Sequence, residues 1–380
     1  MRKTGRYENL GSTHSFIPHP LPPENPTLAL TPEITAIYGQ AMNSLGKLNE
    51  MAHRVPDIQR FIKAYVTKEA LLSSAIEGVH TTLLDVFTQP LSESKPNKNT
   101  QLVMNYTKAL DQALSLIKND GLPISSRVIL TAHRELMALG EGDKADPGNY
   151  RKQAVKVGNL VPPPAPMIPD LISQLEQFIN NDESLPPLIK AGLTHVQFET
   201  IHPFLDGNGR IGRLLIVLQL VDSTLLHAPI LYPSYYFKKH ALEYYRTLNH
   251  VRTEGDFEGW ITFYLNAIQA SSADAYRRAK DIEKLETELA TLFSKKSSAS
   301  RENRVQGLAV LFKFPVISIN ELASQLGIAY NTASQIISDF TKENILIEST
   351  KQKRGKLFTF EQYLDILERE YEEQNFEIQK

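Results

Sequence analysis

The segment "FETIHPFLDGNGRIGRLL", residues 198–215, places a histidine, an aspartate, three glycines, an asparagine and two arginines between apolar flanks. His202 precedes Pro203, and a residue before proline disfavours the helical conformation. We therefore expect the preceding helix to end at this histidine, leaving the imidazole on a loop. Residues 207–209 lead into the next helix, where backbone N–H groups and the helix dipole favour an anion. The segment predicts a phosphate-binding loop between two helices.

Charged side chains beside the glycines suit the same ligand. Arg210 and Arg213 are three residues apart in the first helical turn, so both guanidinium groups reach the same side and can grip phosphate oxygens. Asp206 is positioned to hold a Mg²⁺ that also binds those oxygens. Each residue alone could be a helix cap or a solvated arginine. Their combination within twelve positions favours a nucleotide site.

The string from Gly207 to Gly212 also satisfies G-x-G-x-x-G, the dinucleotide fingerprint. That fingerprint requires a β-strand before it and an acidic residue about 20 positions later, at the end of a second strand. Helix-patterned sequence lies on both sides here instead, and the segment lacks the lysine–serine or lysine–threonine pair of a Walker A loop. We therefore set the Rossmann interpretation aside.

Composition limits the remaining choices. The 380 residues include no cysteine, which excludes disulfides, thiolate nucleophiles and Cys-ligated metals. The 41 basic and 43 acidic residues give a formal charge of −2, so no global field favours nucleic acid or membrane. The N-terminus has no apolar run typical of a signal peptide, and no stretch of eighteen apolar residues occurs. We expect a cytoplasmic protein without a membrane partner.

The stretch "HPFLDGNGRIGR", 202–213, resembles the signature of the Fic family, H-P-F-x-D/E-G-N-G-R-x-x-R, and departs from it at no position. The resemblance implies a helical bundle around this loop that transfers AMP from ATP to a target hydroxyl. It implies that His202 is the general base and that Asp206 binds Mg²⁺ or Mn²⁺. The ATP-binding residues that it implies are His202, Gly207, Asn208, Gly209, Arg210, Ile211, Gly212, Arg213 and Tyr245. Residues 207–209 would hold the α- and β-phosphates, Arg213 the γ-phosphate, and Tyr245 would face the adenine.

A second motif lies far upstream. In "LLSSAIEGVH", Ser73 and Glu77 are four residues apart on one face of an expected helix. The pair resembles the inhibitory motif [S/T]-x-x-x-E-[G/N] of many Fic proteins, in which the glutamate pairs with the second arginine of the signature. That arginine is Arg213 here. The resemblance implies self-inhibition within one chain, whereas an ordinary surface glutamate is the alternative.

Alternation in "QAVKV", residues 153–157, predicts a short β-hairpin or flap bounded by proline-rich turns. In the Fic family such a flap adds a strand to the target backbone and aligns its hydroxyl. A hairpin that only covers the core fits the sequence equally well.

The chain is predicted to be mainly α-helical, with a Fic-type bundle, the flap and a C-terminal winged helix-turn-helix domain. Residues 1–30 are proline-rich and expected to be irregular. The predicted division is a helical N-terminal region with the inhibitory helix at 1–110, the catalytic domain at 111–290, a polar linker at 291–303, and the winged helix with a final helix at 304–380.

The C-terminal segment offers a small basic wing, "STKQKRGK", with Lys351, Lys353, Arg354 and Lys356. The expected recognition helix, "AYNTASQIISDF", has no arginine, and the tail is acidic. The pattern favours partner recognition or dimerisation over DNA binding. Alternatives to protein adenylylation are a nucleotide-sensing DNA-binding regulator and removal of AMP by the same site. The expected partners are ATP, a target protein with a reactive Ser, Thr or Tyr hydroxyl, the chain itself, and a second copy in a homodimer.

Overall fold

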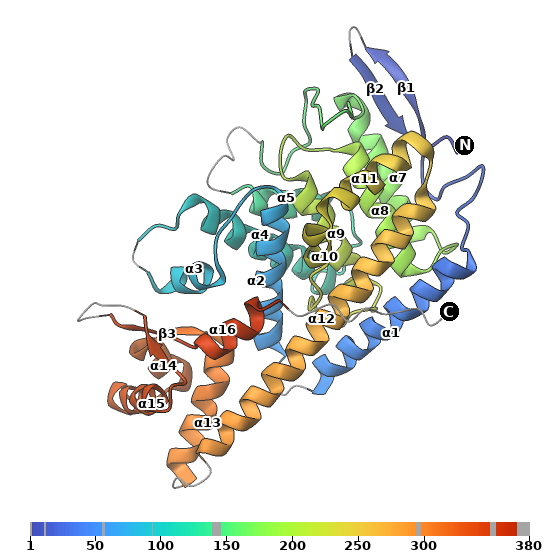
Figure 1. Ribbon diagram of the computed structural model, residues 1–380. Coiled ribbons are helices and arrows are strands. Elements are labelled where there is room, and N and C mark those ends of the chain that lie inside the picture. The colour runs from blue at the N-terminus through green and yellow to red at the C-terminus, as the bar shows by residue number, and fades with distance from the viewer. Residues whose placement is uncertain are drawn as a thin grey trace. The chain divides into compact units, whose positions relative to one another are not determined.

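The computed structural model describes residues 2–10, 13–54, 58–92, 94–138, 146–293, 298–349 and 355–370 (Figure 1). The chain divides into two compact units, which are described separately. The first comprises Met1–Pro56, Tyr65–Thr82 and Pro96–Ala273, and the second comprises Asp57–Ala64, Leu83–Lys95 and Asp274–Lys380. The predicted four-part division along the chain stays a prediction.

The first unit is mainly helical, as predicted. Two helices contribute residues to both units, namely α2 (Gln59–Ile76) and α12 (Phe257–Leu292). Its other elements are β1 (Gly5–Leu10), β2 (Thr13–Pro18), α1 (Pro32–Arg54), α4 (Lys98–Lys118), α5 (Ser126–Leu136), η2 (Ala165–Met167), α7 (Ile168–Asn181), α8 (Pro187–Ile201), α9 (Asn208–Asp222), α10 (Ser234–Lys239) and α11 (Ala241–Glu254).

Helices α8 and α9 pack against each other and form the core of this unit. Helix α9 is buried on nearly every face, as its unbroken apolar sequence predicts. Trp260 of α12 is fully buried, and its indole N–H donates to the Gly192 carbonyl of α8 at 2.8 Å. Helices α4 and α5 also contact α9. The loop that joins α8 to α9 is therefore held by a rigid helix pair.

The expectation of an irregular N-terminus is wrong for residues 5–10 and 13–18. Strands β1 and β2 form an antiparallel hairpin with Gly5 opposite Pro18 and Leu10 opposite Thr13. The proline-rich composition did not indicate the cross-strand pairing of Tyr7 with Phe16. Their rings lie edge to face, with centroids 5.2 Å apart. The hairpin is anchored because Phe16 is buried and its N–H donates to the Val161 carbonyl at 2.9 Å.

The predicted flap also differs from expectation. Residues 153–157 contain no strand, and only Val157 and Leu160 form an antiparallel bridge around a turn at Gly158. At the start of this segment the Gln153 carbonyl accepts a hydrogen bond from the Arg151 side chain at 3.0 Å. The flap is thus a short turn with an irregular arm.

The second unit contains the start of α2, the end of α12, and a helical segment with a small sheet. Its elements are α3 (Leu83–Thr88), η1 (Gln89–Leu91), α13 (Ser298–Lys313), β3 (Val316–Ser318), α14 (Ile319–Leu326), α15 (Tyr330–Lys342), β4 (Ile347–Glu348), β5 (Leu357–Thr359) and α16 (Glu361–Glu368). The antiparallel sheet has the order β3-β5-β4. This order of elements is the one expected of a winged helix, and the assignment to that class stays a prediction.

The linker predicted at 291–303 overlaps two helices. Helix α12 continues to Leu292 and α13 begins at Ser298, and residues 294–297 lie outside the described part of the chain. Alanine, arginine and glutamate in 298–303 are good helix formers, which outweighs their polarity as a linker signal. The final helix ends at Glu368 within the described part of the chain, and residues 371–380 lie outside it.

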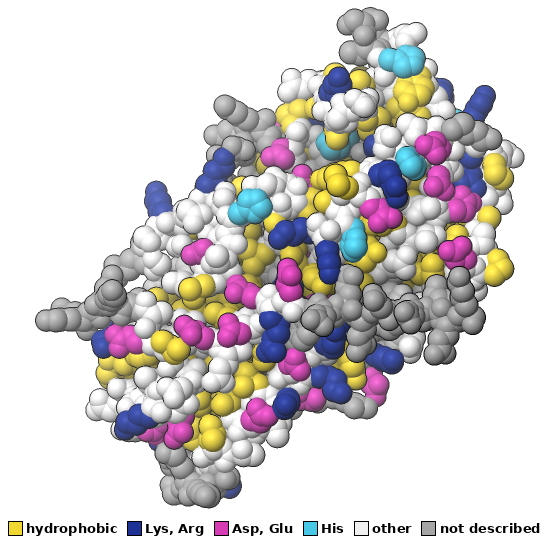
Figure 2. Space-filling model, in the orientation of Figure 1, with side chains coloured by type: hydrophobic (Ala, Val, Ile, Leu, Met, Phe, Trp, Pro, Cys, Tyr) yellow, Lys and Arg dark blue, Asp and Glu magenta, His cyan; other side chains and the backbone are white. Residues whose placement is uncertain are grey.

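Three of the four predicted wing cations, Lys351, Lys353 and Arg354, lie outside the described residues. The fourth, Lys356, pairs with Glu348 at 2.9 Å. Figure 2 shows basic and acidic side chains interspersed over the face in view. Among the described helices, none is long and apolar enough to cross a membrane.

Candidate phosphate-binding site

The histidine loop begins where the sequence predicts. Helix α8 ends at Ile201, and His202 takes a left-handed conformation with φ 50° and ψ 62° rather than the extended one typical before proline. Such a conformation is strained for a residue with a β-carbon, by about 1–2 kcal/mol. The Asn208 side chain closes the loop by accepting from the Phe204 N–H at 2.8 Å and donating to the Phe204 carbonyl at 2.9 Å. The side-chain amide of Asn208 therefore stabilises the conformation of the loop.

Arg151 holds the strained histidine in place, and the sequence analysis missed it. It is 2% exposed, and its guanidinium donates to the His202 carbonyl at 2.8 Å and to the Pro163 carbonyl at 2.6 Å. Its own N–H donates to the Pro203 carbonyl at 2.9 Å. Burial lowers the pKa of Arg151 to about 10, which still leaves it charged. The sequence at 150–152, Tyr-Arg-Lys, has no pattern that would indicate a buried arginine.

His133 of α5 is a second residue that the sequence analysis missed. Its Nδ1 accepts from the Gly148 N–H at 2.9 Å, so Nε2 carries the proton and donates to the Asp206 carbonyl at 3.1 Å. Its ring stacks on Phe204 with centroids 3.7 Å apart. Burial lowers the pKa of His133 to about 4, and the Asp206 carbonyl only partly opposes that. A neutral imidazole therefore orients the carbonyl just before the glycines.

The N-terminus of α9 forms an anion site that is filled by a carboxylate. Gly207 has φ 81°, a left-handed backbone that favours glycine. A β-carbon at Gly209 would overlap the Glu77 carboxylate, so this oxygen lies directly against the helix backbone. Glu77 comes from the residue after α2, where its own helix dipole disfavours a negative charge. The amino end of α9 offers the opposite and favourable field.

Arg213 binds the same carboxylate. Its Nη2 donates to Glu77 Oε1 at 2.6 Å and to the Ser73 carbonyl at 3.0 Å, and its Nε donates to Ser73 Oγ at 2.9 Å. Arg213 is 1% exposed. Burial raises the pKa of Glu77, but the charge and hydrogen bond of Arg213 outweigh it and hold that pKa below its ordinary value. The structure thus joins Ser73, Glu77 and Arg213, three residues singled out from the sequence.

Arg210 is buried with unused donors. It is 3% exposed, and its Nη2 lies 3.3 Å from Asp206 Oδ1. Among the described residues, nothing accepts a hydrogen bond from its Nε or Nη1. Buried guanidinium donors without acceptors are costly, so this arrangement fits an anionic ligand that is absent from the chain itself.

Comparisons with known proteins agree with this geometry. The family model described as Fic/DOC family matches residues 123–220, and the one described as Fic/DOC family N-terminal matches residues 36–115. Residues 123–220 therefore form a Fic/DOC domain. A protein adenylyltransferase Fic from Drosophila grimshawi is 32% identical over 188 residues, which are 49% of this chain and 36% of the relative. One from Drosophila willistoni is 32% identical over 184 residues, covering 48% and 34%.

Solved structures share the fold. A Fic family protein from Desulfovibrio desulfuricans G20 has a TM-score of 0.55 at 21% identity, covering 88% of this chain and 97% of that one. A Fic domain containing signaling protein from Bacteroides thetaiotaomicron VPI-5482 has a TM-score of 0.50 at 19% identity, covering 66% and 98%. Residues 202–213 are called the Fic loop below.

The imidazole of His202 lies on the Fic loop and is half-buried. Burial lowers its pKa to about 4, with the Arg151 charge adding to the drop and the Glu199 carbonyl opposing it. Among the described residues, its Nδ1 has no partner within normal hydrogen-bond geometry. The neutral form at pH 7 can accept a proton, which a base requires.

Asp206 is the only residue that the sequence analysis assigned to a metal. Its side chain is 50% exposed, and its Oδ1 accepts from the Gly207 N–H at 2.5 Å. The described residues contain no group of three or more potential ligands. One exposed carboxylate fits a Mg²⁺ that takes its other oxygens from phosphates and water.

Two predicted residues of the Fic loop face the core. Ile211 is fully buried, so only its backbone can face a ligand. Gly212 lies against Glu199 and His195 of α8, where a β-carbon would overlap the Glu199 carboxyl. Burial raises the pKa of Glu199 to about 7.

Tyr245 lies near the site on α11. It is 50% exposed, and Glu77 and Arg213 are close enough to perturb its pKa, which burial raises. Its neighbour Tyr244 is fully buried and bonds His195 Nε2 at 2.8 Å. The exposed member of the pair is thus the one predicted to face the adenine, and that role stays a prediction.

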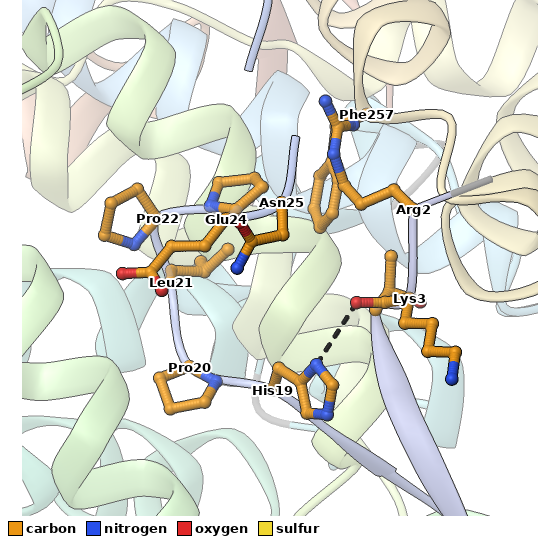
Figure 3. Close-up of a pocket in the computed structure, with 11 residues that line it drawn as sticks. Arg2, Lys3, His19, Pro20, Leu21, Pro22, Glu24, Asn25 and Phe257 are labelled. Atoms are coloured by element: carbon orange, nitrogen blue, oxygen red, sulfur yellow. Dashed lines mark hydrogen bonds between the residues drawn. The ribbon is translucent and has the colours of Figure 1, made fainter. Parts of the chain in front are cut away.

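A cavity of about 570 Å³ lies elsewhere in the first unit (Figure 3). Its lining comes from residues 2–4 and 19–25 and from Phe257. Arg2 at its wall donates to both carboxylate oxygens of Glu258 at 2.8 Å. The side chain of Arg2 therefore links the N-terminal segment to α12 through an ion pair.

Replacing the buried guanidinium of Arg151 is expected to destabilise the protein. Arg151→Ala leaves the His202, Gln153 and Pro163 carbonyls without their donor and should lower the unfolding free energy by about 3 kcal/mol. Chemical denaturation measures this loss, with exposed Lys156→Ala as the control. A change below 1 kcal/mol would contradict the anchoring role.

His133 should make stability depend on pH. Its pKa is about 4 when folded against 6.5 ordinarily, so the unfolded chain binds the extra proton between these values. That contribution to stability is complete above pH 6.5 and is lost as pH falls toward 4, by about 2 kcal/mol at pH 5. We expect His133→Gln to lose less stability than wild type between pH 7.5 and 5 in denaturant titrations. Equal losses would show that His133 does not titrate this way.

Proposed function

We propose that this protein transfers AMP from ATP to a Ser, Thr or Tyr hydroxyl of a target protein, with His202 as the general base. The observation that carries the proposal is the Glu77 carboxylate, which lies against Gly209 at the amino end of α9 and pairs with buried Arg213. A site that binds this carboxylate has the field and the donors that bind phosphate. Two relatives that are 32% identical over about half of this chain are named protein adenylyltransferases.

The reaction needs a base, fixed donors and a leaving group. The target hydroxyl oxygen attacks the α-phosphorus, and its proton passes to neutral His202. A bond forms between that oxygen and phosphorus while the bond to pyrophosphate breaks. The backbone of residues 207–209 and the free donors of Arg210 would stabilise the charge that develops on the phosphate oxygens.

Asp206 would hold the metal ion. When bound, Mg²⁺ neutralises phosphate charge and orients the triphosphate. Arg210 lies close to the same carboxylate and would keep it oriented.

Inhibition follows from competition for one guanidinium. Arg213 already donates to Glu77 and to both oxygens of Ser73, so it cannot also clamp the γ-phosphate. ATP that enters while Glu77 remains would lie in an unproductive pose. The inhibitory helix and the Fic loop belong to one chain, so the restraint is internal.

Target selection is proposed to use the turn around Gly158. Residues 154–156 precede the Val157–Leu160 bridge, and an extended target segment could pair with this arm.

The alternative functions can be weighed against the proton acceptor at His202. A DNA-binding regulator that only senses nucleotide would need no such acceptor. We therefore favour the transferase over the DNA-binding alternative.

Removing the inhibitory carboxylate should activate the enzyme. Glu77→Gly frees Arg213 and is expected to raise AMP incorporation at least tenfold. Intact mass after incubation with ATP and Mg²⁺ should show the added AMP group on a hydroxyl-bearing substrate or on the chain itself. Glu183→Gly, in an exposed loop, is the control and should change nothing. An unchanged yield in Glu77→Gly would contradict the inhibitory role.

The base can be tested separately from binding. His202→Ala in the Glu77→Gly background should reduce AMP transfer by about a thousandfold, since a positioned base contributes roughly that much. ATP binding by calorimetry should change less than threefold. Transfer at the parent rate would remove His202 from the mechanism.

A further inference from the structure

The segment that follows Glu77 is held by the first turn of α4. Asn99 Nδ2 donates to the His80 carbonyl at 2.8 Å. The hydroxyl groups of Thr81 and Thr100 share a hydrogen bond of 2.8 Å. These two bonds are called the α4 clamp below. They act on the chain three and four residues after the inhibitory carboxylate.

The α4 side of the clamp has a fixed position. Thr100 is 1% exposed, and its N–H donates to the side chain of Asn97, which caps α4, at 2.9 Å. Helix α4 also packs against α9, the helix that carries Arg213. The clamp therefore fixes residues 80–81 relative to the helix whose guanidinium binds Glu77.

The other side of the clamp is a short connection. Helix α2 ends at Ile76, and Leu83 begins α3 in the second unit. Residues 78–82 thus join Glu77 to a segment of that unit. Backbone bonds from the N–H groups of residues 77–79 close the end of α2, and the α4 clamp ties the next two residues to the first unit.

We propose that Asn99 and Thr100 are positioning residues for Glu77, and that the α4 clamp sets how readily this carboxylate leaves Arg213. The inference rests on the proposed function, in which Glu77 inhibits AMP transfer. Opening of the turn at 77–79 displaces residues 80–81 as well, because the chain is continuous. The open state therefore loses both bonds of the clamp.

The clamp acts on an equilibrium between a closed turn and an open one. A neutral hydrogen bond typically changes such an equilibrium about fivefold. While the open state is rare, loss of one bond raises its population by the same factor. Arg213 is free to clamp the γ-phosphate only in the open state, so AMP transfer should rise in proportion.

Hydrogen exchange of the full-length chain tests the clamp without any substrate. Thr100→Val removes a hydroxyl while keeping the branched shape of the side chain, and Asn99→Ala removes the other donor. In each variant the backbone amides of residues 77–79 should exchange about fivefold faster, whereas peptides from α9 should exchange as in wild type. Unchanged exchange at residues 77–79 in both variants would overturn the inference.

Thr107→Val is the matched control. Thr107 also lies on α4, but its hydroxyl donates to the Met104 carbonyl of the same helix at 2.7 Å. This variant should leave exchange at residues 77–79 unchanged, and a fivefold rise there would count against the clamp. The double variant of Thr81→Val and Thr100→Val should exchange no faster than the faster single variant, because both remove one bond. Multiplied effects would also overturn the inference.

Self-modification connects the clamp to inhibition. After incubation with ATP and Mg²⁺, intact mass should show about fivefold more AMP on Thr100→Val and on Asn99→Ala than on wild type. In the Glu77→Gly background the same substitutions should change AMP incorporation less than twofold, because the group that they position is absent. An equal rise in both backgrounds would refute the positioning role.

Glu77→Gly by itself separates this inference from the proposed function. No rise in AMP incorporation in that variant would overturn the inhibitory role of Glu77, and the inference with it. A rise in Glu77→Gly without one in either clamp variant would overturn only the roles of Asn99 and Thr100.

Discussion

A buried guanidinium must be surrounded by acceptors, and Arg213 meets this requirement with Ser73 of α2 and with Glu77, which follows that helix. Burial lowers its pKa, but Glu77, Tyr244 and Glu199 raise it above the ordinary value. The result is a permanent positive charge in the middle of the helix pair α8–α9. Because Ser73 lies in α2 and Glu77 directly follows that helix, Arg213 fixes the C-terminal end of α2. The Fic loop and the end of α2 are therefore parts of one electrostatic unit.

The strained histidine depends on a separate set of contacts. Arg151 and Asn208 hold the backbone around His202 and Pro203, while His133 holds the carbonyl of Asp206. All three are buried, so contacts within the protein fix the geometry of the loop. Preorganised donors of this kind contribute to catalysis because they need no rearrangement when charge develops.

The sequence predicted the structure best where a residue pattern has few possible structural roles. His-Pro predicted the helix end at Ile201, and the spacing of Ser73 and Glu77 predicted their common face. Arg151 and His133 could not be found in this way, because their roles depend on carbonyls contributed by distant segments. The same limit applies to the N-terminal hairpin, where the pairing of Tyr7 with Phe16 depends on register rather than on composition. Alternation at 153–157 predicted more pairing than the structure has, because alternation alone does not supply a partner strand and only Val157 and Leu160 form a bridge.

Glu77 follows the last helical residue of α2, and this position affects how it can leave. The terminus is closed by three backbone bonds, from the Glu77 and Val79 N–H groups to the Ser74 carbonyl and from the Gly78 N–H to Ala75. Helix ends open at far lower free energy than whole domains. Fraying of this single turn would withdraw the carboxylate while Ser73 remains in the intact helix. Release of the inhibition that we propose therefore requires only local melting, without any domain having to unfold.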